Sequence, residues 1–151
     1  MIIETVRTSA LLSSVVLLVQ LGCARVRIGQ EANESSIVVK ELVKTTKSWD
    51  GKSLPQYPQG QPEITIRRIS IPAGERLETH SHGVINAGVL LNGELTVVTA
   101  EGKTLHLKAG DPIVEVVNTP HYGLNEGKVP AEIVVFYAGA VDTPISAVKP
   151  R

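Results

Sequence analysis

The chain has 151 residues with 15 basic and 15 acidic side chains, so its formal net charge at pH 7 is zero. This length suits one domain with a real hydrophobic core, and the charge balance excludes a basic surface large enough for nucleic acid. The single cysteine excludes an intramolecular disulfide and a cysteine-rich zinc finger. Five aromatic residues are too few for a platform on which single-stranded nucleic acid stacks.

The N-terminal segment predicts export from the cytoplasm. Residues 10–21 form an apolar run with Arg7 before it and Gly22-Cys23 after it. The run is too short to cross a bilayer, which needs about 20 residues as a helix. It suits the hydrophobic region of a secretory signal peptide. The position of Cys23 after a small residue resembles a bacterial lipoprotein signal, in which the cysteine is lipidated and becomes the first residue of the mature chain.

The lipoprotein resemblance implies a signal peptide over residues 1–22 and a polar tether over residues 23–36, with lipidation at Cys23. It places the protein in the cell envelope, as a lipid-anchored periplasmic protein that contacts the membrane only through its acyl chains. Two alternatives stay open at this stage. One is a plain signal peptide cleaved elsewhere, and the other is an N-terminal helix or strand with a buried free cysteine.

Residues 37–151 have the pattern of one all-β domain, because short β-branched runs alternate with glycine- and proline-containing turns. Asn92-Gly93 lies between two such runs and predicts a hairpin with a tight turn. Strands at intervals of about 8 to 12 residues are typical of an antiparallel sandwich or barrel. The expected strands cover residues 37–43, 64–71, 86–91, 94–99, 104–107, 113–117 and 131–137.

Three of the four histidines indicate a metal site. His80 and His82 lie two positions apart, so on an extended strand both imidazoles point to the same face. His121 follows after several expected strands and turns, and strand pairing can bring it beside the first two. Three imidazoles on one face are a known ligand set for divalent metal ions. The fourth histidine, His106, is expected to be an exposed strand residue.

Eight positions around these histidines resemble the two sequence motifs of the cupin superfamily. They read Gly74-x5-His80-x-His82-x3-Asn86-x6-Gly93 and Gly110-x10-His121-x3-Asn125. The resemblance implies a double-stranded β-helix, or jelly-roll barrel, that holds an ion of Fe, Ni, Mn, Cu or Zn through His80, His82 and His121. It also implies a small-molecule ligand in the barrel cavity and a homodimer.

The sequence departs from the cupin motifs at three places. Asn86 stands where the family usually has a fourth ligand, Glu, and Val116 and Asn118 stand where the family has Pro and Gly. Without the carboxylate, three neutral imidazoles and an amide leave the charge of a divalent ion uncompensated. Such a site binds metal less tightly and polarises a bound substrate oxygen more strongly. Asn86 is either a ligand-binding side chain or a structural amide that bonds across strands.

Two charged side chains are further candidates. Glu115 lies in an otherwise apolar run, where it is either a catalytic base or metal ligand in the cavity, or an edge-strand residue facing water. Arg68 follows Ile64 and Ile66 at alternate positions, so it either points inward to bind a substrate carboxylate or phenolate, or lies at a solvated rim. Tyr122 is expected to point away from the metal.

Two functions follow from the cupin resemblance. The first is a metal-dependent enzyme, with oxygenase-type chemistry of the small quercetinase-like cupins preferred over isomerase or hydrolase chemistry. The second is a non-enzymatic module of the envelope that captures a small ligand or the metal itself. Fold alone does not choose between them.

Overall fold

The structure, a computed structural model, describes residues 36–148, which contain nine strands and no helix. Cys23, the expected signal peptide and nearly all of the expected tether lie outside the described residues. No helix in residues 36–148 offers a membrane-spanning segment. The strands are β1 (Pro62–Ile71), β2 (His80–Ser81), β3 (Ile85–Asn92), β4 (Glu94–Thr99), β5 (Thr104–Lys108), β6 (Pro112–Val114), β7 (His121–Leu124), β8 (Ala131–Ala140) and β9 (Ala147–Val148).

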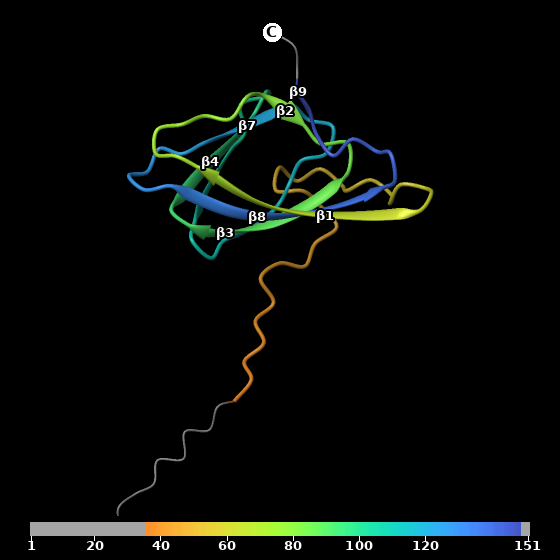
Figure 1. The fold of residues 1–151 in the computed structure, drawn as a ribbon, viewed down its shortest axis with the longest axis horizontal. Helices are drawn as coiled ribbons and strands as arrows, with labels where there is room; N and C mark the ends of the chain where they lie inside the picture. The colour runs from red at the N-terminus through yellow and green to blue at the C-terminus, as the bar shows by residue number, and fades with distance from the viewer. Residues whose placement is uncertain (1–35, 149–151) are drawn as a thin grey trace, which may run out of the picture. The chain divides into compact units, whose positions relative to one another are not determined.

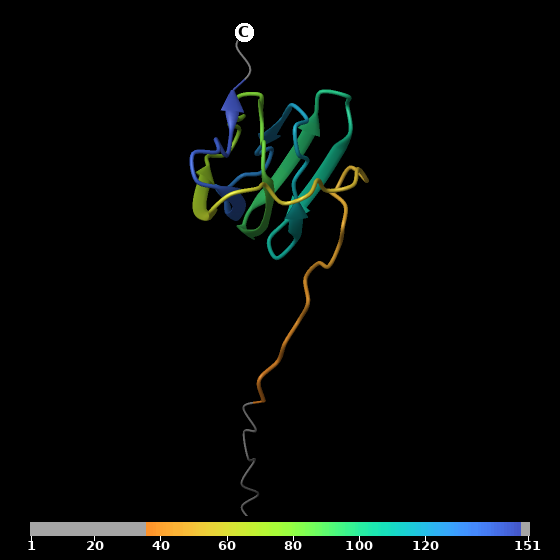
Figure 2. The same cartoon turned by 90° about the vertical axis from the view of Figure 1, so that its right-hand side faces the viewer.

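The strands form two antiparallel sheets that face each other. One sheet has the order β1-β8-β3-β6 and the other the order β5-β4-β7-β2-β9. Figure 1 shows β1, β8 and β3 in one layer with β4, β7 and β2 in the layer above, and Figure 2 shows the two layers from the side. This is a jelly roll, as the resemblance implies, and the all-β prediction is confirmed.

The hydrophobic core lies between the two sheets. Its fully buried members alternate along the strands, as the pleat of a sheet requires. In β8, for example, Ala131, Ile133, Val135 and Tyr137 are buried, whereas Phe136 between them is exposed. The sheet faces that meet therefore carry the apolar side chains, and the polar cavity described below lies among them.

The prediction of a strand over residues 37–43 is wrong. This segment pairs with no other strand of the described chain, and Ile37, Val38 and Val39 are almost fully exposed. A β-branched run favours extended backbone, but a strand also needs a partner edge with which to share its hydrogen bonds.

The expected hairpin over residues 86–99 is also corrected. The turn at Asn92-Gly93 forms, but β3 belongs to one sheet and β4 to the other, so the two strands diverge instead of pairing. Asn92 Nδ2 donates to the Pro130 carbonyl at 2.9 Å. Gly93 has a φ of 74°, and an added Cβ would lie 2.7 Å from that same carbonyl oxygen. The turn therefore leads the chain from one sheet into the other, and it packs closely against the loop that contains Pro130.

This corner makes Gly93 the least replaceable of the turn glycines. Gly93→Ala is expected to lower the free energy of unfolding by at least about 2 kcal/mol, because left-handed strain adds to a clash with backbone atoms. Gly102→Ala is the matched control, since Gly102 also has a positive φ of 85° but no atom within 4 Å of an added Cβ. It should cost about 1 kcal/mol. Equal losses for both variants in urea unfolding would contradict this account of the corner.

Candidate metal site

The first two histidines are held by a very short strand. β2 contains only His80 and Ser81, and it pairs with β7 on one side and β9 on the other. His82 follows directly and forms a parallel bridge to Val117. The extended backbone from 80 to 82 turns both imidazoles to the interior, as the His-x-His spacing predicts.

His121 reaches the same place because it begins β7 and pairs directly with His80. The approach to it contains Asn118, which has a φ of 55° and donates its backbone N–H to the His82 carbonyl at 2.7 Å. Asparagine tolerates this left-handed conformation better than most residues. The turn before His121 therefore forms even though glycine is absent from position 118.

The three imidazoles form one cluster. Their ring centroids lie 4.9 Å apart for His80 and His82, 4.6 Å for His80 and His121, and 5.1 Å for His82 and His121. Each residue offers a ring nitrogen, and these nitrogens all lie within 4.8 Å of one another.

Backbone carbonyl groups fix the orientation of all three rings. The Nδ1 atoms of His80, His82 and His121 lie 2.8, 2.9 and 2.8 Å from the carbonyl oxygens of residues 78, 145 and 119 respectively. A carbonyl oxygen only accepts hydrogen bonds, so each Nδ1 carries the hydrogen and each Nε2 keeps a free lone pair. This is the tautomer in which a histidine ligates a metal through Nε2.

Burial keeps the histidines neutral. Desolvation lowers the pKa of His80 and of His121 below the ordinary value, and it lowers the pKa of His82 to about 4. The neutral imidazole is the form that binds a metal ion.

Glu115 lies in the same cavity. It follows β6, which ends at Val114 instead of continuing to Val117 as the sequence predicts, and its N–H donates to the Asn86 carbonyl at 3.0 Å. Its Oε2 is 3.5 Å from His121 Nε2, and neither atom has a hydrogen-bond partner among the described residues. Burial raises the pKa of Glu115 to about 7. Of the two open interpretations, the structure supports the cavity and not the solvent-exposed edge.

A loop from the N-terminal side packs beside Glu115. Trp49 donates its backbone N–H to the carbonyl of Val114, the residue before Glu115, at 2.9 Å. Buried Asp50 holds the loop through a 2.6 Å hydrogen bond from the Ser48 hydroxyl. No pattern in the sequence connects this loop with the site, although Trp49 is the only tryptophan in the chain.

Asn86 is fully buried on β3 and also borders the cavity. Its amide nitrogen donates weakly to the Val84 carbonyl at 3.3 Å, and its Oδ1 has no partner among the described residues. A purely structural amide would have both groups satisfied. The free oxygen therefore supports a ligand-binding role over the structural one.

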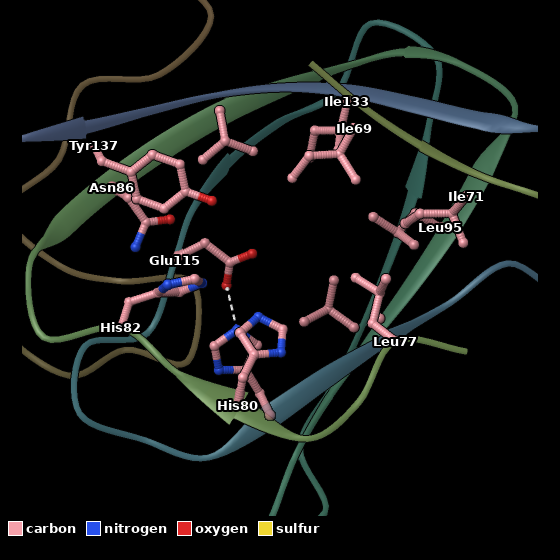
Figure 3. Close-up of a pocket in the computed structure, with 14 residues that line it drawn as sticks. Ile69, Ile71, Leu77, His80, His82, Asn86, Leu95, Glu115, Ile133 and Tyr137 are labelled. Carbon is pink, nitrogen blue, oxygen red and sulfur yellow. Dashed lines mark ion pairs between the residues drawn. The ribbon is translucent and has the colours of Figure 1, made fainter. Parts of the chain in front are cut away.

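The cavity has a polar and an apolar half. Figure 3 shows His80, His82, Glu115, Asn86 and Tyr137 gathered on one side. On the other side lie five aliphatic side chains, Ile69, Ile71, Leu77, Leu95 and Ile133. The cavity volume is only about 40 Å³, enough for an ion with two or three water-sized groups.

A larger recess of about 300 Å³ forms the mouth of the cavity. It shares Tyr137, His80 and His82 with the inner cavity and is bordered in addition by Arg67 and Glu78. The Tyr137 ring packs against that of His82 at a centroid distance of 5.4 Å and lines both the recess and the inner cavity. Tyr137 was not singled out in the sequence, but its place in the alternating run of β8 predicts that it points inward.

Of the two alternatives for Arg68, the inward orientation is not observed. Arg68 shares a face with Ile64 and Ile66, as the alternation predicts, but this face is the outer one, and both isoleucines are more than half exposed. Arg68 is exposed and forms an ion pair with Glu132. Its neighbour Arg67 faces the cavity mouth instead.

Three other residues lie where the sequence predicts. Asn125 is fully buried and holds its turn, since its amide donates to the carbonyls of Ile71 and Val129 at 2.9 Å each. His106 is exposed on β5. Tyr122 points away from the histidines and stacks beneath the Arg76 guanidinium at 3.7 Å.

The side chains present fit a divalent metal ion. Three oriented imidazoles offer Nε2 lone pairs at mutual distances suited to one ion, and the buried Nε2 of His121 has no hydrogen-bond partner among the described residues. Glu115 Oε2 and Asn86 Oδ1 are two further unpaired oxygens in the same cavity. His80, His82 and His121 would hold the ion.

Comparison with known proteins agrees with this fold. The family model described as "Cupin domain" matches residues 67–137. Among solved structures, the DMSP lyase DddQ from Ruegeria pomeroyi is 20% identical with a TM-score of 0.50, over 57% of this chain and 43% of that one. An oxalate decarboxylase from Lactobacillus farciminis, in a formate complex, is 21% identical with a TM-score of 0.50, over 56% and 26%.

The chain thus spans less than half the length of either structure, and these similarities concern the fold alone. A search of curated proteins returns no match.

Metal content tests the cluster directly. Elemental analysis of the purified full-length protein should find a divalent ion at less than about one per chain, because no carboxylate replaces the usual fourth ligand at Asn86. His80→Ala and His121→Ala should reduce the content to background, whereas His106→Ala, the matched control, should not. Stoichiometric metal in a variant that lacks two of the three cluster histidines would disprove the assigned site.

Proposed function

We propose, for a chain whose residues 67–137 match the model of the cupin domain, that the histidine cavity binds a divalent metal ion and that the protein is an enzyme of oxygenase type acting on a small oxygenated molecule. The observation that carries the proposal is the set of three Nε2 atoms, each oriented by a backbone carbonyl, with the Glu115 carboxyl group beside them.

The residues have distinct parts in this proposal. His80, His82 and His121 hold an ion of Fe, Ni, Mn, Cu or Zn, whose identity imidazole ligands alone do not fix. When bound, the ion supplies open coordination positions at which a chelating substrate is oriented and its oxygen polarised. Asn86 presents its free Oδ1 to a donor group of the substrate.

Glu115 is the proposed catalytic base. It is the one acidic side chain that lines the inner cavity in the described part of the chain. Its Oε2 has no hydrogen-bond partner there, so it is free to accept the proton of a substrate hydroxyl group. The carboxyl group is buried, so the proton is held at Oε2 while the substrate reacts.

The apolar half of the cavity limits the substrate. Leu77, Leu95 and Ile133 exclude water from the side opposite the histidines, and they leave room for only a few heavy atoms. A large polycyclic substrate does not enter a volume of about 40 Å³. The reacting part of the substrate is therefore small, and any larger part lies in the mouth recess.

Oxygen uptake by the metal-loaded protein tests the proposal. The full-length chain, loaded in turn with each of the five metals, is offered a panel of small molecules with two adjacent oxygen atoms. We expect substrate-dependent oxygen uptake with at least one metal. Glu115→Gln should lower the rate by about 100-fold or more while metal content stays unchanged. The control is Glu126→Gln on the outer surface, which should have no effect.

Two results would overturn the proposal. One is metal binding with no oxygen uptake for any metal and substrate, and the other is an unchanged rate in Glu115→Gln. The second candidate function, a binding module, is favoured by the small cavity volume, which suits a metal ion with little else. A binding module would account for metal binding without turnover.

We also propose that the mature protein is anchored to the cell envelope by lipid at Cys23, as its position after residues 10–21 predicts. Each acyl CH₂ buried in a membrane contributes about 0.8 kcal/mol, so two or three chains anchor a protein firmly. Mass spectrometry of protein from the native host should find an N-terminal, acylated Cys23. Cys23→Ala should release the protein from the membrane fraction. An unmodified Cys23, or an intact Met1, would remove the lipoprotein interpretation.

A further inference from the structure

We propose that Arg67, at the mouth of the cavity, binds the carboxylate of the substrate, so that the substrate is a small organic acid. This inference rests on the proposed function only in taking the histidine cavity as the place where substrate binds. It assigns a specificity-determining residue that neither the cupin motifs nor the metal site includes.

The strand β1 places Arg67 at the mouth. Arg67 pairs with Val135 in the uninterrupted register between β1 and β8, and it shares its side of the strand with Ile69 and Ile71, which face the interior. Its guanidinium carbon lies 5.9 Å from the centroid of the Tyr137 ring. One face of the planar guanidinium is thus supported by an aromatic side chain that also borders the inner cavity.

Arg67 is also the described arginine that lines the recess and has no ion-pair partner in the described part of the chain. Arg68 is paired with Glu132, and Arg76 does not line the recess. In the described part of the chain, Arg67 forms no ion pair, not even with Glu78, which borders the same recess. The fork of guanidinium donors is therefore available to an anion from outside.

The charge balance of the site favours an anionic substrate. The inner cavity offers three neutral imidazoles, one amide and one carboxyl group, which leave a divalent ion with at least one uncompensated positive charge. Arg67 lines the recess together with His80, His82 and Tyr137, so its positive charge lies at the same mouth as the charge of the ion.

The geometry favours a carboxylate over a phosphate. Among the described residues that line the recess, Arg67 is the only cationic side chain. One guanidinium matches a planar, singly charged carboxylate with two parallel hydrogen bonds. A phosphate group carries more charge and usually meets several cations or a row of backbone N–H groups.

Ligand binding, measured by calorimetry, tests the inference without relying on turnover. The full-length protein, both metal-free and loaded with the ion that it retains, is titrated with acetate, propionate and butyrate. Each is compared with its neutral amide, acetamide, propionamide or butyramide, and inorganic phosphate is titrated as well. We expect every carboxylate to bind more tightly than its amide, and more tightly than phosphate.

Arg67→Gln should weaken carboxylate binding by about 10- to 100-fold and leave amide binding unchanged, as expected for the loss of charge-assisted hydrogen bonds. Arg68→Gln is the matched control, because it removes the same charge from the next position on the opposite face. It should leave both affinities within about twofold. Metal content should be unchanged in both variants.

Carboxylates that bind no better than their amides, tighter binding of phosphate, or equal losses in the two variants would overturn the assignment of Arg67. A failure of the oxygenase proposal gives a different result. In that case oxygen uptake is absent, yet carboxylate binding still depends on Arg67 and not on Arg68.

Discussion

The pairing of His80 with His121 is the contact on which the site depends. β2 has only two residues, and it is held inside the second sheet by its pairing with β7 and with the edge strand β9. The pairing with β7 joins two histidines that are far apart in the sequence, and their rings lie 4.6 Å apart. The pairing of β2 with β7 therefore also assembles the metal site.

Burial sets the protonation states of the side chains in this site. Desolvation keeps the three imidazoles neutral and raises the pKa of the single carboxyl group among them. Unpaired nitrogen and oxygen atoms at His121, Glu115 and Asn86 are costly in a protein interior, and such groups are rare without a functional reason. Their concentration in one small cavity is what distinguishes a binding site from a merely packed barrel.

Much of the fold could be predicted because strand alternation and turn residues are local signals. Six of the seven expected strands form, and the fixed spacing of glycines and histidines identifies the architecture. The failures concern pairing. Asn92-Gly93 predicts a turn but not whether its strands pair or separate, and residues 37–43 are suited to a strand but pair with no strand in the described part of the chain.

The site could also be predicted in part. The spacing of the histidines predicts the metal cluster. The arginine at the cavity mouth could not be predicted, because the apolar side chains of β1 change from the outer to the inner face along the strand. Ile64 and Ile66 lie on the outer face and Ile69 and Ile71 on the inner one. Alternation tells which residues share a face, but only the packed structure tells which face is inside.

The carbonyl groups that orient the histidines have one more consequence. They belong to the backbone at positions 78, 119 and 145, so the side chains at these positions take no part in holding the rings. Residue types there are free to change without altering the metal-binding tautomer. In sites where a carboxylate side chain orients each histidine, a single substitution removes the support. Here backbone carbonyl groups orient the rings, so substitutions of the side chains at these three positions leave the orientation of the histidines in place.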